Sequence, residues 1–264
     1  MMTRRTFVAA ATAGITVGLQ LNAAGRLNIG VGTYSYHSLS MEDMIAQLTS
    51  LRIREIEMSR GEFMLLSHPK DEIFRSARTK LDAAGIHCVS YYAATIREDR
   101  ELAAAVRFAK LLGARNITGD ATGDILKRID EQCTQARLTF GIHNHYFKQK
   151  FAYESPEDLL GALAGLSRTV GVTLDVGHFA SCGYDTVDAV RKLESRLKLV
   201  HLKDVAASGG EDNVLIGQGI AKIPEVMKEL RRIHFAGLVA IEYEKEGPVE
   251  EDMRHEVEYA RKLA

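Results

Sequence analysis

The feature that most constrains this chain is a regular alternation of short β-rich runs with longer amphipathic segments. Eight runs, most of them rich in Val, Ile or Leu, predict strands at residues 27–35, 53–58, 86–92, 115–120, 138–145, 170–178, 197–205 and 237–244. Short apolar runs of this kind are typical of strands that helices cover on both faces of a parallel sheet. The segments between them are therefore expected to be helical crossovers.

Helix signals lie between these runs. Ser40 with Asp43 three residues later, and Ser155 followed by Pro156, are typical of helix starts. Apolar residues recur at helical spacing in residues 71–85 and end at Gly85. Further helices are expected within residues 223–237 and 250–264.

Eight such units without hairpin signals predict one fold class, α/β, as a single (β/α)8 TIM barrel over residues 26–264. An open doubly wound sheet is the alternative. It would require a glycine-rich phosphate turn after the first strand, and "GVGTYS" lacks the third glycine of that motif.

Residues 1–25 differ from the rest of the chain. Their only charges are Arg4 and Arg5, within "TRRTFV", and an uncharged run rich in Ala, Gly and Thr follows. This pattern resembles a twin-arginine signal peptide, which implies recognition by the twin-arginine export machinery and a periplasmic location. An N-terminal extension of another kind is the alternative. A membrane anchor, if the leader stays uncleaved, is disfavoured because the run is only weakly apolar.

The charge balance gives no support for nucleic-acid binding. Without residues 1–25 the chain has 32 basic residues against 35 acidic ones, and no basic stripe is visible. The three cysteines, at positions 88, 133 and 182, form neither a disulfide framework nor a C-x-x-C metal motif.

In a (β/α)8 barrel the carboxyl ends of the strands meet at one mouth, so a site must be built from strand-end residues. Four consecutive strands in the second half carry metal-competent groups at or near their ends: His143 and His145, Asp175, His201, and Glu242. A single histidine or aspartate there is ordinarily structural. Four such strand ends together predict one divalent ion, Mn²⁺, Co²⁺ or Zn²⁺, and Mg²⁺ is also compatible.

Seven segments carry a resemblance to a known family, in chain order "GTYSYH", "EIEM", "HNHYF", "LDVGH", "VHLKD", "IGQGIAKIPEVMKEL" and "AIEYE". Together they resemble the xylose isomerase-like sugar phosphate isomerase/epimerase superfamily, over most of the chain beyond the leader. The resemblance implies a metal held by Asp175, His201 and Glu242, with His143 at a position where many relatives have glutamate. Loss of that glutamate disfavours a symmetric two-carboxylate proton shuttle, and hence simple C3 epimerisation.

The remaining candidates surround these ligands. Glu242, as ligand and base, is one catalytic candidate. His178 is a second, because its counterparts in relatives contact a substrate oxygen. Lys203 is the third, since it could reach a carbonyl or an oxyanion, although an ion pair with a neighbouring carboxylate is an equal alternative. Substrate-binding candidates are His145, Glu57, Tyr34 and His37, and Glu57 has the alternative role of positioning a histidine.

The sequence therefore predicts a metal-dependent isomerase or epimerase that acts on a sugar or keto-sugar through an enediolate. A keto-sugar lyase or dehydratase on the same site, and an inactive sugar-binding barrel, are alternatives. A metal-dependent DNA-repair endonuclease is disfavoured, because the second and third strands end without the extra histidines of such enzymes. The expected partners are a small carbohydrate substrate and further copies of the chain.

Overall fold

Eight parallel strands close into a barrel in the computed structural model, which describes residues 26–146, 153–210 and 212–264. Around the barrel they follow the order β1, β10, β7, β6, β5, β4, β3, β2. Their bounds are β1 Asn28–Gly32, β2 Glu55–Met58, β3 His87–Thr95, β4 Asn116–Asp120, β5 Thr139–His143, β6 Val170–Asp175, β7 Leu197–Leu202 and β10 Leu238–Ile241. The predicted (β/α)8 barrel is confirmed.

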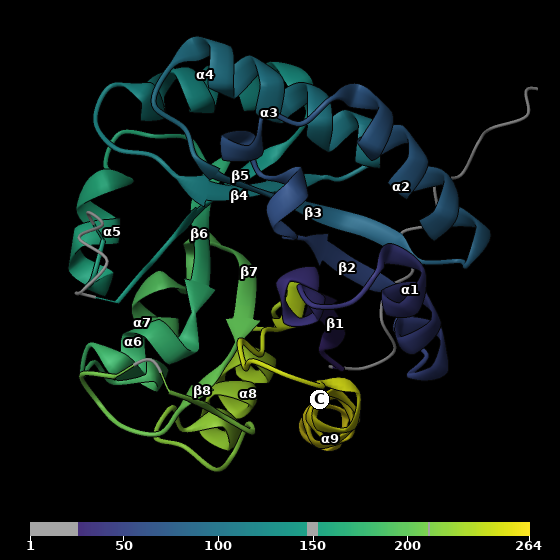
Figure 1. The fold of residues 1–264 in the computed structure, drawn as a ribbon. Coiled ribbons are helices and arrows are strands. Elements are labelled where there is room, and N and C mark those ends of the chain that lie inside the picture. The colour runs from purple at the N-terminus through teal and green to yellow at the C-terminus, as the bar shows by residue number, and fades with distance from the viewer. Residues whose placement is uncertain (1–25, 147–152, 211) are drawn as a thin grey trace, which may run out of the picture.

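Helices connect the strands and surround them (Figure 1). They are α1 Met41–Ser50, α2 Asp71–Ala83, α3 Asp99–Leu112, α4 Ile125–Ala136, α5 Pro156–Ala162, α6 Val176–Ser181, α7 Thr186–Leu193, α8 Ile223–Arg232 and α9 Glu250–Leu263. Ser40 and Ser155 cap α1 and α5 as predicted, each accepting a hydrogen bond from the backbone N–H three residues later.

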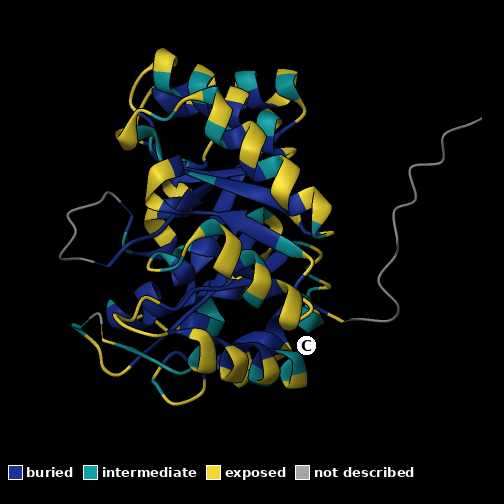
Figure 2. Cartoon of the chain, turned by 45° about the vertical axis from the view of Figure 1, so that its right-hand side comes forward, coloured by how far each residue is buried: buried dark blue, intermediate teal, exposed yellow. Residues whose placement is uncertain are grey.

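Burial follows the two periodicities of the sequence (Figure 2). The barrel strands are almost entirely buried, whereas each long helix buries one stripe and exposes the other. In α8, for example, Val226 and Leu230 are buried and Lys228 is exposed. The apolar core therefore fills the space between strands and helices and leaves the mouth of the barrel for polar groups.

Several strands end earlier than predicted. The first ends at Gly32 and continues as a 3-10 helix, Thr33–Tyr36. The sixth ends at Asp175, whose side chain accepts a hydrogen bond from the N–H of His178 and so starts α6. Strands five and eight also end two or three residues early. The reason is shared: apolar and β-favouring residues continue past the strand end, but the backbone there turns into the loops of the mouth.

One short hairpin-like pairing was not predicted. Residues Asp204–Val205 (β8) and Asn213–Val214 (β9) form a two-stranded antiparallel sheet outside the barrel. The Asp204 carboxylate also accepts hydrogen bonds from the backbone N–H groups of Gly217, Gly219 and Ala221. A Cβ atom at Gly219 would lie 2.2 Å from Asp204 Oδ1, so only glycine fits there. This contact explains the spacing between "HLKD" and "GQG".

The leader predicted at residues 1–25 lies outside the described residues. Among the residues that the structure does describe, no helix has the length and apolar character needed to cross a membrane.

Candidate metal centre

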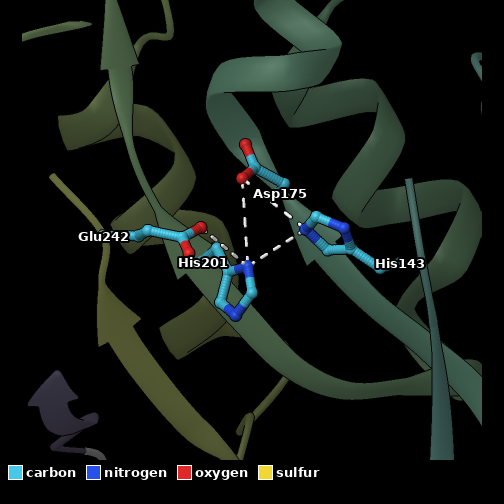
Figure 3. A group of neighbouring side chains, drawn as sticks. All are labelled: His143, Asp175, His201 and Glu242. Carbon is cyan, nitrogen blue, oxygen red and sulfur yellow. Dashed lines mark hydrogen bonds and ion pairs between the residues drawn. The ribbon is translucent and has the colours of Figure 1, made fainter. Parts of the chain in front are cut away.

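The strand ends of the second half of the barrel bring four side chains together, those of His143, Asp175, His201 and Glu242 (Figure 3). They come from the ends of β5, β6 and β7 and from the residue after β10. One ligand atom from each lies within 4.8 Å of the other three. The Nδ1 atom of His201 is 3.0 Å from Glu242 Oε2, 3.1 Å from His143 Nε2 and 3.9 Å from Asp175 Oδ2.

Strand register produces this convergence. Asp175 lies opposite His201 in the pairing of β6 with β7, and His201 lies opposite Ala240 of β10. Side chains alternate along each strand, so Glu242, two residues after Ala240, returns to the same face. Four residues spread over 100 positions of sequence are thereby placed at one end of the barrel.

The four side chains fit a divalent cation. All are buried, and Asp175 Oδ2 and Glu242 Oε2 make no hydrogen bond within the described residues and have only ion-pair contacts, with Lys203 and with histidines. Buried carboxylate oxygens are costly unless a cation or a donor compensates them. Two nitrogens and two carboxylates are suitable ligands for Zn²⁺, Mn²⁺ or Co²⁺. Ligand atoms at about 2.0–2.2 Å from one ion lie roughly 3–3.5 Å apart. The contacts of His201 Nδ1 with Glu242 and His143 have this length, and those of Asp175 Oδ2 with the two histidines are longer, at 3.8 and 3.9 Å.

Glu57, from β2, positions His201. Its Oε2 lies 2.5 Å from His201 Nε2, and its Oε1 accepts a hydrogen bond of 2.7 Å from Ser90 Oγ. Burial lowers the pKa of His201, but the carboxylates of Glu242 and Glu57 raise it well above its usual value. Carboxylates that orient a histidine ligand in this way raise its basicity toward a metal. Of the two sequence-based roles for Glu57, the structure therefore favours the positioning of a histidine.

Lys203 is buried among carboxylates. Its Nζ lies 3.3 Å from Asp175 Oδ2, 3.5 Å from Glu242 Oε2 and 3.0 Å from Glu244 Oε2. Burial lowers the pKa of Lys203, but these three carboxylates raise it well above its usual value. The ion-pair alternative is thus the arrangement found, with a charged ammonium beside the cluster. Gly177 of "LDVGH" makes room for it, since a Cβ there would lie 2.6 Å from Lys203 Cγ.

Two further histidines lie against the cluster. His178 Nε2 is 3.6 Å from Asp175 Oδ2, and burial, followed by the charge of Lys203, lowers the pKa of His178 well below its usual value. His145 Nε2 is 3.1 Å from His143 Nδ1. Both histidines therefore border the four-residue cluster.

Tyr34 and His37 lie farther out. Burial and the charges of Glu244 and Glu242 raise the pKa of Tyr34, which places its phenol near the acidic side of the mouth. His37 contacts Tyr34 instead, through a distance of 3.0 Å from Nδ1 to the backbone oxygen and through ring stacking. Neither belongs to the four-residue cluster.

Sequence reasoning missed two acidic residues of the mouth. Asp120 ends β4 and its Oδ1 lies 2.7 Å from His145 Nε2. Glu244 pairs with Lys203, and burial together with the charge of Glu242 raises its pKa. Both signals were present: Asp120 is a strand-end carboxylate in "NITGD", and Glu244 follows Glu242 by two residues.

Comparison with known proteins gives the chain a family. A protein-family model described as "Xylose isomerase-like TIM barrel" matches residues 56–263. An uncharacterized protein of Methanocaldococcus jannaschii is 31% identical over 91 residues, which are 33% of this chain and 31% of that protein. The matched part thus spans about a third of that relative.

Solved structures share the fold. The probable 3-DHS dehydratase AsbF from Bacillus anthracis superimposes with a TM-score of 0.74 at 14% identity, over 88% of this chain and 98% of that one. D-psicose 3-epimerase from Clostridium cellulolyticum H10, solved with D-tagatose, has a TM-score of 0.70 at 12% identity, over 90% of this chain and 99% of that one. The IolI protein with a bound zinc atom has a TM-score of 0.66 at 16% identity, over 90% of this chain and 96% of that one. Because the family model spans most of its length, this chain belongs to the xylose isomerase-like TIM barrel family.

Proposed function

We propose that this protein is a divalent-metal-dependent enzyme that isomerises or epimerises a sugar or keto-sugar through an enediolate. The main support is that ligand atoms of His143, Asp175, His201 and Glu242 lie close together. Two buried carboxylate oxygens among them make no hydrogen bond within the described residues. The shared fold of a D-psicose 3-epimerase and of a zinc-bound protein supports both the reaction class and the metal. Mn²⁺, Co²⁺ and Zn²⁺ suit these ligands best, and Mg²⁺ is also compatible.

Three side chains of the centre have different roles in the proposed reaction. A divalent cation at the centre would supply positive charge to stabilise an oxygen anion of the substrate. Burial raises the pKa of Glu242, but His201 and Lys203 lower it far below its usual value, so Glu242 stays ionised as a ligand and is a weak base. His178 stays neutral and can contact a substrate hydroxyl or accept its proton. Lys203 stays charged and adds a second positive group for the anion.

A lyase or dehydratase on the same centre is the second candidate. It would begin with the same removal of a proton next to a carbonyl, after which a neighbouring oxygen leaves instead of a proton returning. The presence of a histidine at position 143, where a second carboxylate would serve a symmetric proton shuttle, favours it. A probable dehydratase among the proteins of the same fold adds support.

We further propose that residues 1–25 are a twin-arginine leader and that the substrate is a saccharide met in the periplasm. Replacing Arg4 and Arg5 with Lys should leave the protein in the cytoplasm, as measured by cell fractionation and immunoblotting. Unchanged export of that variant would contradict the proposal.

The reaction is tested by carbon-bound hydrogen exchange. The purified protein, loaded with Mn²⁺, is incubated in D2O with a panel of aldoses, ketoses and saccharides that carry a ring ketone. Deuterium uptake next to a carbonyl, followed by NMR, is expected for at least one sugar and should disappear in His178→Gln. A new stereocentre or a shifted carbonyl indicates an isomerase or epimerase, whereas an unsaturated product indicates the lyase. No exchange with any sugar, from protein that holds metal, would favour the inactive sugar-binding barrel.

A further inference from the structure

A second group of ligand atoms lies beside the first and shares one residue with it. Asp120, His143 and His145, all buried, each offer one atom within 4.8 Å of the other two. His145 Nε2 lies 2.7 Å from Asp120 Oδ1 and 3.1 Å from His143 Nδ1. The other ring nitrogen of His143, Nε2, faces the first centre. His143 thus stands between two sets of ligands.

His145 Nε2 lies within hydrogen-bond distance of two groups, Asp120 Oδ1 and His143 Nδ1. An imidazole nitrogen either carries one proton or offers one lone pair in the ring plane, so it makes one strong in-plane hydrogen bond. His145 Nε2 can therefore make a strong hydrogen bond with only one of these two neighbours, although both lie close to it.

The two ring nitrogens of His143 face different groups. Its Nε2 lies 3.1 Å from His201 Nδ1 and 3.8 Å from Asp175 Oδ2, so Nδ1 is the nitrogen directed toward the second group. A cation located between Asp120 Oδ1, His145 Nε2 and His143 Nδ1 would accept one lone pair from each of them.

We propose that Asp120 Oδ1, His145 Nε2 and His143 Nδ1 bind a second divalent cation, so that the His143 ring bridges two metal ions. The second ion replaces the Nδ1 proton of His143, which is released to solvent, and no electron is transferred. Two nitrogens and one carboxylate suit Zn²⁺, Co²⁺ or Mn²⁺. The proposal rests on the proposed function, since it shares His143 with the first centre.

The charges nearby are consistent with a cation. Asp120 brings one negative charge, and its ion pair among the described residues is with His145. The ring of Tyr92 packs edge-on against His143, with 5.6 Å between the ring centroids, and forms one wall of this second group. A substrate held at such a pair of ions would present oxygens to both, which fits a polyhydroxylated sugar.

The test is metal stoichiometry with zinc alone. Purified protein is freed of metal, titrated with Zn²⁺ and analysed by elemental analysis after gel filtration, for the wild type, Asp120→Asn, His145→Gln and Asp175→Asn. Asp124→Asn, at an exposed aspartate on the same βα loop as Asp120, is the matched control. Two ions per chain are expected in the wild type and the control, and one in Asp120→Asn and in His145→Gln.

Other outcomes separate the two centres. One ion per chain in the wild type, lost in Asp175→Asn but kept in Asp120→Asn, would overturn the second site and leave the first. No ion in the wild type would overturn both. Two ions that persist in Asp120→Asn and in His145→Gln would also overturn the second site.

A spectroscopic measurement tests the bridge itself. Two Cu²⁺ ions joined by one imidazolate ring couple magnetically, so the integrated EPR intensity of fully copper-loaded protein should fall well below its copper content. In Asp120→Asn the intensity should match the copper content. Full intensity in wild type that holds two copper ions would overturn the bridging role of His143. Circular dichroism of each variant verifies that loss of metal is not loss of fold.

Discussion

His201 Nε2 lies 2.5 Å from Oε2 of Glu57, a residue 144 positions earlier in the chain. Because this contact occupies Nε2, the other nitrogen, Nδ1, faces His143 and Glu242. A carboxylate on β2 thus determines which nitrogen of a β7 histidine is presented to the candidate metal centre.

Glu57→Gln should weaken metal binding by about 10- to 100-fold, the usual cost of changing a group that orients a metal ligand. The glutamine keeps the shape but lowers the basicity of His201. Competition with a chelating dye measures the affinity for Zn²⁺. Glu62→Gln, at an exposed glutamate after the same strand, is the control and should bind as the wild type does. Equal affinities in both variants would contradict the positioning role.

Asp175→Asn should lose metal while keeping the fold. Asparagine caps a helix about as well as aspartate, so α6 should still start there. The substitution removes the charge of a metal ligand, however, and the affinity should fall by more than about 100-fold, the upper cost of altering a group that only orients a ligand. Asp185→Asn makes the same change at the N-cap of α7. Asp185 does not belong to the four-residue cluster, so this variant should keep its full metal content. Elemental analysis beside circular dichroism gives both readouts.

Lys203→Met should destabilise the metal-free protein strongly. Removing one partner of a buried ion pair costs roughly 3–5 kcal/mol, because carboxylates are left buried without a counter-charge. A divalent cation restores positive charge, so the variant should gain more thermal stability from Mn²⁺ than the wild type does. Thermal unfolding with EDTA and with Mn²⁺ measures both effects. Lys222→Met, at an exposed lysine, should show neither. An unchanged melting temperature without metal would argue against the ion pairs.

Glu256 should make stability depend on pH. Burial raises its pKa to about 8, and its Oε2 has no hydrogen-bond partner within the described residues. Since the folded-state pKa lies above the unfolded value, the folded state binds the proton more tightly. Stability is therefore highest below the unfolded value, near 4.5, and falls as the pH rises toward about 8.

Glu256→Gln should remove this dependence. The free energy of unfolding of Glu256→Gln, relative to that of the wild type, should increase from pH 5 to pH 9. The increase should be at most about 5 kcal/mol, since each pKa unit corresponds to about 1.4 kcal/mol. Urea unfolding at both pH values measures it. Glu258→Gln, at an exposed position of the same helix, is the control. A constant difference between Glu256→Gln and wild type at both pH values would refute a raised pKa.

Much of the fold was accessible from local patterns. Buried strands and amphipathic helices have different periods in the sequence, and caps such as Ser40 and Ser155 mark where helices begin. Strand ends were less accessible. Asp175 ends its strand through a hydrogen bond to the N–H of His178, and "VGH" after it reads equally well as strand.

For the site, the sequence determined which residues stand at strand ends, and the barrel then brings those ends to one mouth. Distances across the mouth were decided only by the tertiary structure. The contact of Glu57 with His201, the carboxylates around Lys203 and the approach of Asp120 to His145 all join different strands. These contacts depend on how the strands are staggered when the barrel closes, a property of all eight strands together and of no single segment.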